Sequence, residues 1–187
     1  MNMPEIRITP PLSDIDIKKI KSGDRLLITG IVYAARDAAH RRMAERIERG
    51  EELPFDIRGQ IIYYMGPAPA RPGTAVGSAG PTTSGRMDRY SPALIKMGLK
   101  GMIGKGPRSE DMIRTMREYG CLYMAAVGGA GALLSRRIKS STVIAWEDMG
   151  AEALRRMEVV DFPVIVVNDS EGRDLYRESV SRYRIDG

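Results

Sequence analysis

The residues of this chain that are best suited to chemistry lie in the segment 80–88, whose sequence is GPTTSGRMD. Its glycines let backbone N–H groups approach a ligand, its centre offers consecutive hydroxyls, and Arg86 adds a fork of donors that suits a carboxylate or phosphate. The segment therefore predicts an anion-binding turn, while an ordered glycine-rich turn whose hydroxyls cap the backbone explains the same residues. It is neither a P-loop nor a dinucleotide-binding G-x-G-x-x-G motif, because no Gly-Lys-Ser/Thr ending follows its glycines and their pattern differs.

A second basic residue lies where a strand is expected to give way to a helix. Arg36, His40 and Met43 recur at helical spacing, which places them on the face that looks inward. An inward arginine is costly unless it meets an anion, so Arg36 predicts either a bound anion or a salt bridge to Asp37 or Asp88. His40 is interpreted first as a hydrogen-bonded core or pocket-wall residue, because it lacks the neighbouring groups that mark a catalytic base or a metal ligand.

Two further glycine-rich segments are candidates for anion binding. In Gly104-Lys105-Gly106-Pro107, a lysine stands between glycines at the end of a predicted strand. Lys105 is either a surface lysine in a turn or a cation directed at a carboxylate. Gly128-Gly129-Ala130-Gly131 leads into a predicted helix whose free N–H groups could bind an anion, although close packing explains these glycines equally well.

Apolar periodicity predicts the elements that position these residues. Strands are expected over 6–9, 25–34, 60–65, 99–103, 121–127, 142–146 and 157–167, the last one broken at Asp161-Phe162-Pro163. Helices are expected over 14–21, 36–49, 92–97, 110–119, 131–138 and 173–183, with Ser13, Ser91 and Ser109 as N-caps. The loop 66–79 has too few apolar side chains to bury much. The alternation predicts one α/β domain over residues 1–187 with a mixed sheet.

Composition narrows the class of protein. Hydrophobic residues make up 43% and charged residues 28%, which is ordinary for a soluble globular protein, and runs such as 164–167 are too short to span a bilayer. Residues 1–7 lack the pattern of a signal peptide, so a cytoplasmic protein is expected. The formal charge of +5 comes without a nucleic-acid-binding motif. Basic residues alternate with acidic ones over 41–52 and 108–117, which indicates solvated helix faces, and the net charge favours an anionic substrate or an acidic partner.

The cysteine content excludes some sites. Cys121 is the single cysteine, so no internal disulfide can form, and a buried free thiol in a reducing compartment is expected. One cysteine and one histidine cannot hold an iron–sulfur cluster, which normally takes several thiolates. If this protein belongs to a cluster enzyme, another chain must hold the cluster.

Three motifs in order give the chain a specific resemblance. GPTTSGRMD, the preceding Ala35-Arg36-Asp37-Ala38-Ala39-His40 and the following Lys105-Gly106 resemble the beta subunit, or C-terminal domain, of class I iron–sulfur fumarate hydratases and L-tartrate dehydratases. The resemblance runs from about Asp24 to the end of the sequence. It implies a swivelling β/β/α fold and reversible hydration of fumarate to (S)-malate. It also implies a [4Fe–4S] cluster on a partner alpha subunit, whose open iron acts as a Lewis acid, within an α2β2 heterotetramer.

The resemblance also implies roles for residues of this chain. Arg36, Arg86 and Lys105 would bind the carboxylates of the substrate, and Thr82 would transfer a proton with the help of an acid from the other subunit. The supporting residues implied by the same motifs are Thr83, Ser84, Asp88 and His40. Thr83, Ser84 and Asp88 would hydrogen-bond the turn and hold Arg86 in place, and His40 has no assigned catalytic role.

Three alternatives remain open from the sequence. Tartrate is an alternative substrate, because the beta-subunit motifs are common to both enzymes. A stand-alone dicarboxylate-binding module would bind its anion without a partner chain. A purely structural interaction protein would use the segment 66–88 for docking, so that substitution of Arg86 would break assembly before changing any rate.

Overall fold

The most apolar stretches of the chain form strands that are covered on both faces. In β3 (Ile61–Tyr63), Ile61 and Tyr63 belong to one apolar cluster, whereas Ile62 belongs to another. Successive side chains of a strand project to opposite sides, so a strand with apolar residues at every position must be buried on both. This requirement places β3 in the interior of the protein.

The computed structural model describes residues 5–127 and 129–184. The strands of this part of the chain are β1 (Glu5–Ile8), β2 (Arg25–Ala34), β3, β4 (Gly101–Gly104), β5 (Leu122–Ala125), β6 (Ile138–Ala145) and β7 (Leu154–Asn168). The α-helices are α1 (Asp14–Lys19), α2 (Asp37–Glu48), α3 (Ser91–Lys96), α4 (Glu110–Tyr119), α5 (Gly131–Ser135) and α6 (Leu175–Tyr183). Two 3₁₀ helices, η1 (Ser84–Met87) and η2 (Glu147–Glu152), complete the set.

The strands form a mixed sheet that closes on itself. β2, β3, β4 and β5 are parallel neighbours in that order, and β7 runs antiparallel to both β5 and β2. Five strands therefore make a small barrel, to which β1 adds beside β2 and β6 adds beside β7. The predicted α/β class with a mixed sheet is confirmed, and the closure through β7 is a feature that the sequence did not indicate.

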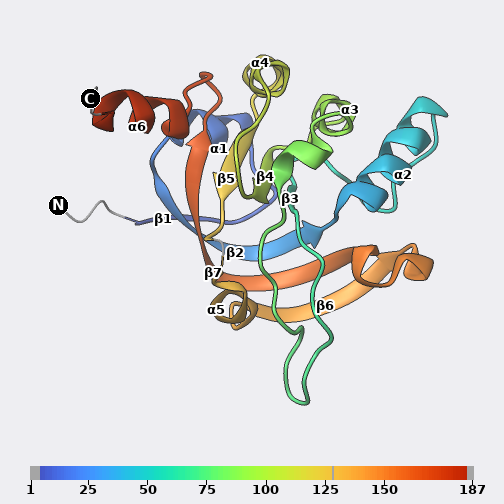
Figure 1. Cartoon of the computed structure of the whole chain (residues 1–187). Helices are drawn as coiled ribbons and strands as arrows, with labels where there is room; N and C mark the ends of the chain where they lie inside the picture. Colours follow the sequence, from blue (N-terminus) through green and yellow to red (C-terminus); the bar gives the residue numbers. More distant parts are fainter. Residues whose placement is uncertain (1–4, 128, 185–187) are drawn as a thin grey trace.

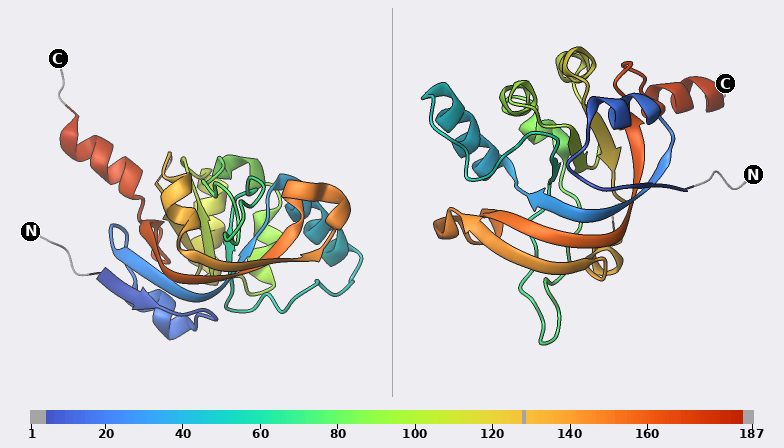
Figure 2. Two further views of the ribbon diagram at one scale, coloured as in Figure 1. Left: turned by 90° about the horizontal axis from the view of Figure 1, so that it is seen from below. Right: turned by 180° about the vertical axis from the view of Figure 1, so that it is seen from behind.

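The helices lie mainly on one side of this sheet. Figure 1 shows α2, α3 and α4 in a row along one side, while β6 and the first half of β7 lie on the opposite side. This is the β/β/α layering that the family resemblance implied. Figure 2 shows α6 extending away from the body of the protein.

β7 differs from its prediction. The expected break at Asp161-Phe162-Pro163 is wrong, because the structure has one strand across these residues. Asp161 has a positive φ of 48°, and the pairing with β2 shifts register between Ile28 and Gly30. The Asp161 N–H donates to Thr29 Oγ1 at 3.0 Å. The motif therefore accompanies a bulge in the strand instead of ending it, and the continuous β7 pairs with both β2 and β5.

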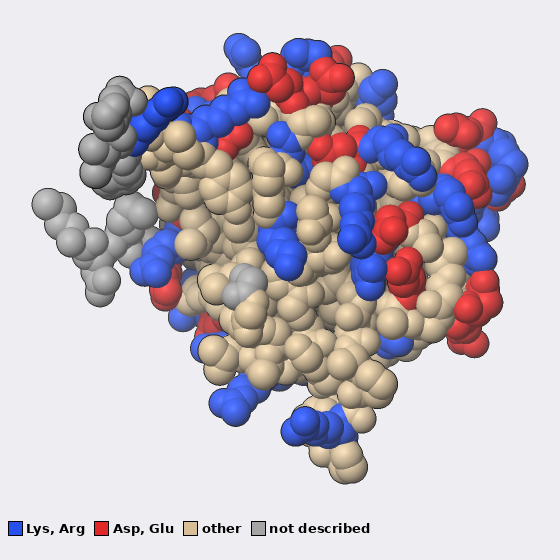
Figure 3. All heavy atoms as spheres, viewed as in Figure 1, with Lys and Arg blue, Asp and Glu red and all other residues tan. Residues whose placement is uncertain are grey.

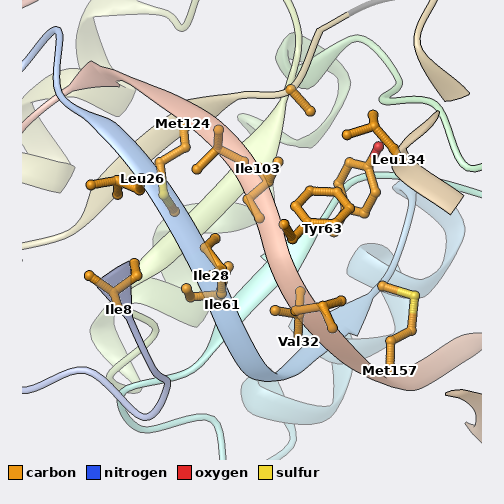
Figure 4. Close-up of a cluster of buried hydrophobic side chains, with 14 of the residues drawn as sticks. Ile8, Leu26, Ile28, Val32, Ile61, Tyr63, Ile103, Met124, Leu134 and Met157 are labelled. Carbon is orange, nitrogen blue, oxygen red and sulfur yellow. The ribbon is translucent and has the colours of Figure 1, made fainter. Parts of the chain in front are cut away.

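Two apolar clusters fill the protein. The first lies inside the barrel, where the side chains of β2, β3, β4, β5 and β7 converge; Figure 4 shows Ile61, Tyr63 and Ile103 among them. The second lies between the sheet and helices α2, α3 and α4, and it includes Met43, Leu94 and other large apolar residues. The parallel strands are thus sandwiched between two cores, which holds their carboxyl ends in place.

The loop 66–79 is more ordered than its composition suggested. Ala68 N–H donates to the carbonyl of Ser78, and Gly77 N–H donates to the carbonyl of Ala68, each at 3.0 Å, so that the loop forms a narrow arm. Val76 and Ala79 are buried in the barrel cluster. The prediction that this loop buries little is wrong for these two residues. The hydrogen bonds of the arm fold the loop back, so that both side chains pack against the barrel cluster.

Helix starts follow the sequence at two sites and depart from it at a third. Ser13 and Ser109 accept N-cap hydrogen bonds from the backbone, as predicted. Ser91 does not cap α3; it is buried in the first turn, where its hydroxyl donates to the carbonyl of Met87 and meets the Tyr64 hydroxyl at 3.1 Å. The helix expected over 131–138 ends at Ser135, because the chain enters β6 at Ile138.

Two further findings concern the edges of the described chain. No helix within residues 5–127 and 129–184 is long and apolar enough to cross a membrane. The interpretation of residues 1–7 falls partly on 1–4, which lie outside the described residues, as does Gly128 of the glycine-rich segment 128–131.

Candidate functional site

The carboxyl ends of three neighbouring parallel strands bring the candidate site residues to one edge of the sheet. Arg36 follows β2, Tyr64 and the arm follow β3, and Lys105 follows β4. In open or closed α/β sheets, ligands commonly bind at the carboxyl ends of the strands, because loops of different origin meet there. Residues that are far apart in the sequence therefore share this edge.

Main-chain hydrogen bonds attach the segment 80–88 to the same edge. Thr82 N–H donates to the carbonyl of Tyr64 at 2.8 Å, and Lys105 N–H donates to the carbonyl of Thr82 at 3.2 Å. Ser84 N–H in turn donates to the carbonyl of Lys105 at 2.9 Å, so that Thr83 and Lys105 form a short parallel bridge. The hydroxyl-bearing turn is thus held against the end of β4 by its backbone, which leaves the side chains of Thr82 and Thr83 available.

Ser84 has a different environment from its two neighbours. It is fully buried, and its hydroxyl lies 2.9 Å from the hydroxyl of Tyr123. The Tyr123 hydroxyl also donates to the carbonyl of Gly106 at 2.8 Å. A Cβ at Gly104 would lie 2.0 Å from Ser84 Oγ, so a larger residue there would displace this serine hydroxyl. Ser84 therefore ties the turn to β5 and to the loop that contains Lys105.

Arg36 is partly buried at the start of α2. Its Nη2 atom lies 3.2 Å from Glu152 Oε1, and its Nε lies 3.8 Å from Asp37 Oδ1. The predicted salt bridge to Asp37 is thus present but long, Asp88 is not a partner, and Glu152 of η2 is one that the sequence did not indicate. A Cβ at Gly66 would lie 3.0 Å from Arg36 Cδ, so this glycine allows the guanidinium to lie across the base of the arm.

Arg86 is exposed on η1 and borders a hollow of about 480 Å³. The hollow is lined by residues of α2 and of the segment 85–90, including Asp37, Arg41 and Arg89. Among the residues that the structure describes, the side chain of Arg86 has no hydrogen-bond or ion-pair partner. Figure 3 shows basic side chains across the middle of the face seen in Figure 1, with acidic ones over α4 and along the side where α2 lies. The hollow is suited to a small anion.

Lys105 and Thr82 complete the set of exposed polar groups at this edge. Lys105 is exposed, and within the described part of the chain its ammonium group makes no ion pair. Thr82 is half-buried, and its hydroxyl has no hydrogen-bond partner there either. Two cations and a hydroxyl are therefore uncommitted beside the partly neutralised Arg36.

The family resemblance suggested that Asp88 holds Arg86 in place, but the structure pairs Asp88 with another residue. Its Oδ1 atom lies 2.7 Å from Nε of Arg108, and its Oδ2 accepts a hydrogen bond from Ser109 N–H at 2.8 Å. Arg108 is only 4% exposed, so it is an exception to the solvated helix faces that were expected for most basic residues of the range 108–117. A buried arginine next to a motif aspartate is the residue that sequence reasoning missed; its position after Gly106-Pro107, ahead of the α4 cap, was the only local signal.

His40 is fully buried beneath Arg36. Its Nδ1 lies 2.8 Å from the carbonyl oxygen of Arg36, which can only accept, so Nδ1 carries the proton. The imidazole meets the Tyr64 ring edge-on at 5.0 Å. Burial, helped by the charge of Arg108, lowers the pKa of His40 to about 4, although the Arg36 carbonyl acts in the other direction. His40 is therefore neutral near pH 7 and fixes the backbone of Arg36.

The low pKa of His40 predicts a pH dependence of stability. The unfolded imidazole binds a proton below pH 6.5, whereas the folded one resists it until about pH 4. Stability from this group is therefore complete above pH 6.5 and falls as the pH drops, by up to roughly 3 kcal/mol. Urea unfolding of wild type and His40→Gln at pH 7 and pH 4.5 measures the difference, and only wild type should show this component.

The same residue allows a direct spectroscopic check. His40 is the only histidine of the chain, so its imidazole proton signals in NMR are unambiguous. We expect them to titrate with a midpoint near pH 4. A midpoint near 6.5, the value of a solvated imidazole, would show that the ring is accessible to water and contradict the buried assignment.

The implied iron–sulfur cluster does not fit the thiol of this chain. Cys121 is buried among the apolar side chains between the sheet and the helices. This burial raises the pKa of its thiol to about 12. A cluster ligand must be a thiolate. Within residues 5–127 and 129–184, no group of three or more His, Cys, Asp and Glu side chains is arranged to hold a metal ion. A cluster would need its ligands from another chain.

Comparison with known proteins adds family evidence to this geometry. A protein-family model described as Fumarase C-terminus matches residues 2–179. The chain is 36% identical over 182 residues to "Fumarate hydratase class I, anaerobic" of Escherichia coli, covering 95% of this chain and 33% of that protein. It is 34% identical over 193 residues to "Fumarate hydratase 2" of Leishmania major, covering 96% of this chain and 34% of that protein.

A third relative is similar in length. The chain is 38% identical over 173 residues to "Putative L(+)-tartrate dehydratase subunit beta" of Methanocaldococcus jannaschii, and the match covers 89% of both chains. The chain thus spans about a third of the fumarate hydratases that it matches, but nearly all of a protein named as a subunit.

Proposed function

The chain belongs to the fumarase C-terminus family, and from this premise we propose that it is the beta subunit of a two-subunit iron–sulfur hydro-lyase. Its reaction is the reversible hydration of fumarate to (S)-malate. The relatives named fumarate hydratase and putative tartrate dehydratase are hydro-lyases, which supports this class of reaction. The chain supplies carboxylate-binding and proton-transfer residues to a site that it forms together with its partner.

The arrangement at the carboxyl ends of the strands is the observation on which the proposal depends. Arg36, Arg86 and Lys105 come from separate segments yet follow or flank the ends of β2 and β4. The last two are exposed, with no ion-pair partner in the described residues. Uncommitted cations on one edge match the charge of a dicarboxylate, and arginine can bind each carboxylate through two hydrogen bonds.

Thr82 is the residue that we assign to proton transfer. Hydration adds a hydroxyl group to one carbon of the double bond and a proton to its neighbour, so a group beside the substrate must deliver that proton or remove it in reverse. A threonine hydroxyl is a poor base on its own, and the structure describes no acid bonded to Thr82. We therefore assign the acid that exchanges protons with Thr82 to the partner chain.

The partner and its cofactor belong to the same proposal. In the longer relatives, about two thirds of the length lies outside the match to this chain. The relative of matching length is named as a subunit. We propose that a separate alpha subunit corresponds to this additional part and holds the [4Fe–4S] cluster, because Cys121 does not fit as a ligand. An α2β2 assembly in the cytoplasm is the arrangement that we expect.

L-Tartrate is the second candidate substrate. The observation in its favour is the match over 89% of both chains to a protein named as a putative tartrate dehydratase subunit. Tartrate is also a four-carbon dicarboxylate, so the same three cations would bind it. The two candidates differ only in the groups between the carboxylates.

Reconstitution with the partner tests the proposal. The chain is mixed without oxygen with the cluster-bearing alpha subunit from the same source, and consumption of fumarate and of tartrate is followed, with each subunit alone as control. We expect rapid fumarate hydration only in the mixture. Tartrate consumption instead would change the substrate and retain the two-chain reaction.

Two outcomes would contradict the proposal. No turnover of either substrate by a formed complex with an intact cluster would mean that the 80–88 segment binds something else. Tight binding of fumarate to the isolated chain in calorimetric titration would favour a stand-alone binding module, because half of a two-chain site should bind weakly.

A further inference from the structure

A buried charge lies directly behind the candidate site. The side chain of Arg108 has no exposed surface, and its Nε lies 2.7 Å from Oδ1 of Asp88, which is itself largely buried. Its Nη1 donates to the Tyr64 hydroxyl at 3.3 Å. Within the described residues, neither Nε nor Nη2 of Arg108 makes a hydrogen bond, and Asp88 Oδ1 accepts none, so the close ion pair with Asp88 is the main compensation for the charge of Arg108.

The pair connects the two segments that contain the uncommitted cations. Asp88 is the residue after η1, so it lies two positions beyond Arg86. Arg108 belongs to the loop that begins at Lys105 and ends at the α4 cap. The second carboxylate oxygen of Asp88 accepts from Ser109 N–H at 2.8 Å, in that same loop. Asp88 thus adds a side-chain link between the Arg86 segment and the Lys105 segment, beside the main-chain bridge of Thr83 and Lys105.

Aromatic rings enclose the guanidinium and limit its freedom. Its central carbon lies 5.4 Å from the centre of the Tyr64 ring and 5.0 Å from that of Tyr123. The Tyr123 hydroxyl is hydrogen-bonded to Ser84 of the Arg86 segment and to the carbonyl of Gly106 in the Lys105 segment. The carbonyl of Tyr64 accepts a hydrogen bond from Thr82 N–H. The neighbours of the Arg108 guanidinium, Tyr64, Tyr123 and Asp88, are therefore themselves linked to the segment 80–88 or belong to it.

Stability alone does not account for an arginine at this place. Removing a guanidinium from water is costly, and apolar residues of similar volume commonly serve as well or better in a protein interior. What a buried ion pair adds is a defined geometry, because both partners must lie at a fixed distance and orientation. At this location, the geometry that it defines is the spacing between the two cation-bearing segments.

We propose that Arg108 is a positioning residue of the site, which sets the spacing of Arg86 and Lys105 by holding Asp88 to the 105–109 loop. The inference rests on the proposed function and deepens it, since the spacing of two cations selects dicarboxylates by the distance between their carboxylates. Arg108 itself does not contact the substrate. Its role is to make the site selective for a four-carbon diacid.

The test uses the complex of this chain with its partner and three inhibitors that differ by single methylene groups. Malonate, succinate and glutarate are compared as competitive inhibitors of fumarate hydration in wild type and in the double variant Arg108→Met/Asp88→Asn. The double variant removes both charges and keeps an oxygen that can accept from Ser109 N–H. An ion pair of the same length but greater exposure at the other end of β4, Lys100 and Asp14 at 2.7 Å, supplies the control double variant Lys100→Met/Asp14→Asn.

We expect wild type and the control to prefer succinate over both other diacids by at least about tenfold. In the Arg108 double variant this preference should fall to about twofold or less, and KM for fumarate should rise by roughly tenfold. A purely structural role would lower the unfolding temperature but leave the preference unchanged. If the double variant does not assemble, Arg108→Lys, which retains a charge opposite Asp88 and loses the planar guanidinium, is compared in the same way.

The outcomes separate this inference from the proposed function. Unchanged selectivity in a variant of an active complex, or an active wild type that does not discriminate by diacid length, would overturn the role of Arg108. A wild-type complex that neither hydrates fumarate nor binds any of the three diacids would overturn the proposed function, and the inference with it.

Discussion

Replacing Arg86 with lysine is expected to lower kcat/KM for the dicarboxylate substrate by roughly a hundredfold while the complex with the partner chain still forms. Lysine retains the charge but loses the planar fork that binds a carboxylate through two parallel hydrogen bonds. Arg86 is exposed and has no partner among the described residues, so no internal contact is lost. Steady-state kinetics of the complex measure the rate, and size-exclusion chromatography measures assembly.

The matched control for this prediction is Arg114→Lys. Arg114 is also an exposed arginine, on α4, where it pairs with Asp111 of the same helix. Its replacement should leave both the rate and the assembly unchanged. Near-normal activity of Arg86→Lys would remove this residue from the site, and loss of assembly before any loss of rate would favour the interaction-protein alternative.

Replacing Thr82 with alanine is expected to lower kcat by about 10² to 10⁴ while KM changes only a few-fold, because the hydroxyl transfers a proton and contributes little to binding. The two main-chain hydrogen bonds of Thr82, to Tyr64 and Lys105, do not involve its side chain and should survive in alanine. Initial rates over a range of fumarate concentrations separate kcat from KM.

Two other variants make the role of Thr82 specific. Thr82→Ser retains a hydroxyl at the same place and should recover most of the turnover. Thr115→Ala removes a hydroxyl that donates to the carbonyl of Asp111 on α4, remote from the strand ends, and serves as the control. Unchanged kcat in Thr82→Ala would exclude this residue from proton transfer, whatever the result for Arg86.

Local features of the sequence predicted the elements well where the stabilising contacts are themselves local. Ser109 and Gly120 mark the two ends of α4 as predicted, because an N-cap bonds within three residues and Gly120 adopts the left-handed conformation that ends a helix. The bounds of β2 were correct because its run of apolar, β-branched residues favours a strand, although several of its positions are exposed or half-buried. The contacts at the two ends of α4 do not depend on the rest of the fold, whereas the hydrogen bonds of β2 come from β1, β3 and β7.

Predictions failed where a distant segment determines the outcome. Asp161 and Pro163 are typical of a strand end, but pairing with β2 on one side keeps β7 continuous through a bulge. Arg108 has neighbours typical of a solvated helix, yet it is buried because Asp88, twenty positions earlier, supplies the opposite charge. Glu152 lies in a short helix that no local signal links to Arg36.

The sequence by itself determined the types of residue at the candidate site, the α/β class and the absence of enough cysteine for a cluster. Spacing and side-chain chemistry establish these properties without knowledge of which strands are neighbours. Only the tertiary structure decided that the sheet closes through β7, that the strand ends bring Arg36, Thr82 and Lys105 to one edge, and that Asp88 pairs with Arg108 instead of Arg86. The reason is physical: strand pairing and the burial of a charge depend on partners far away in the chain, which no local pattern specifies.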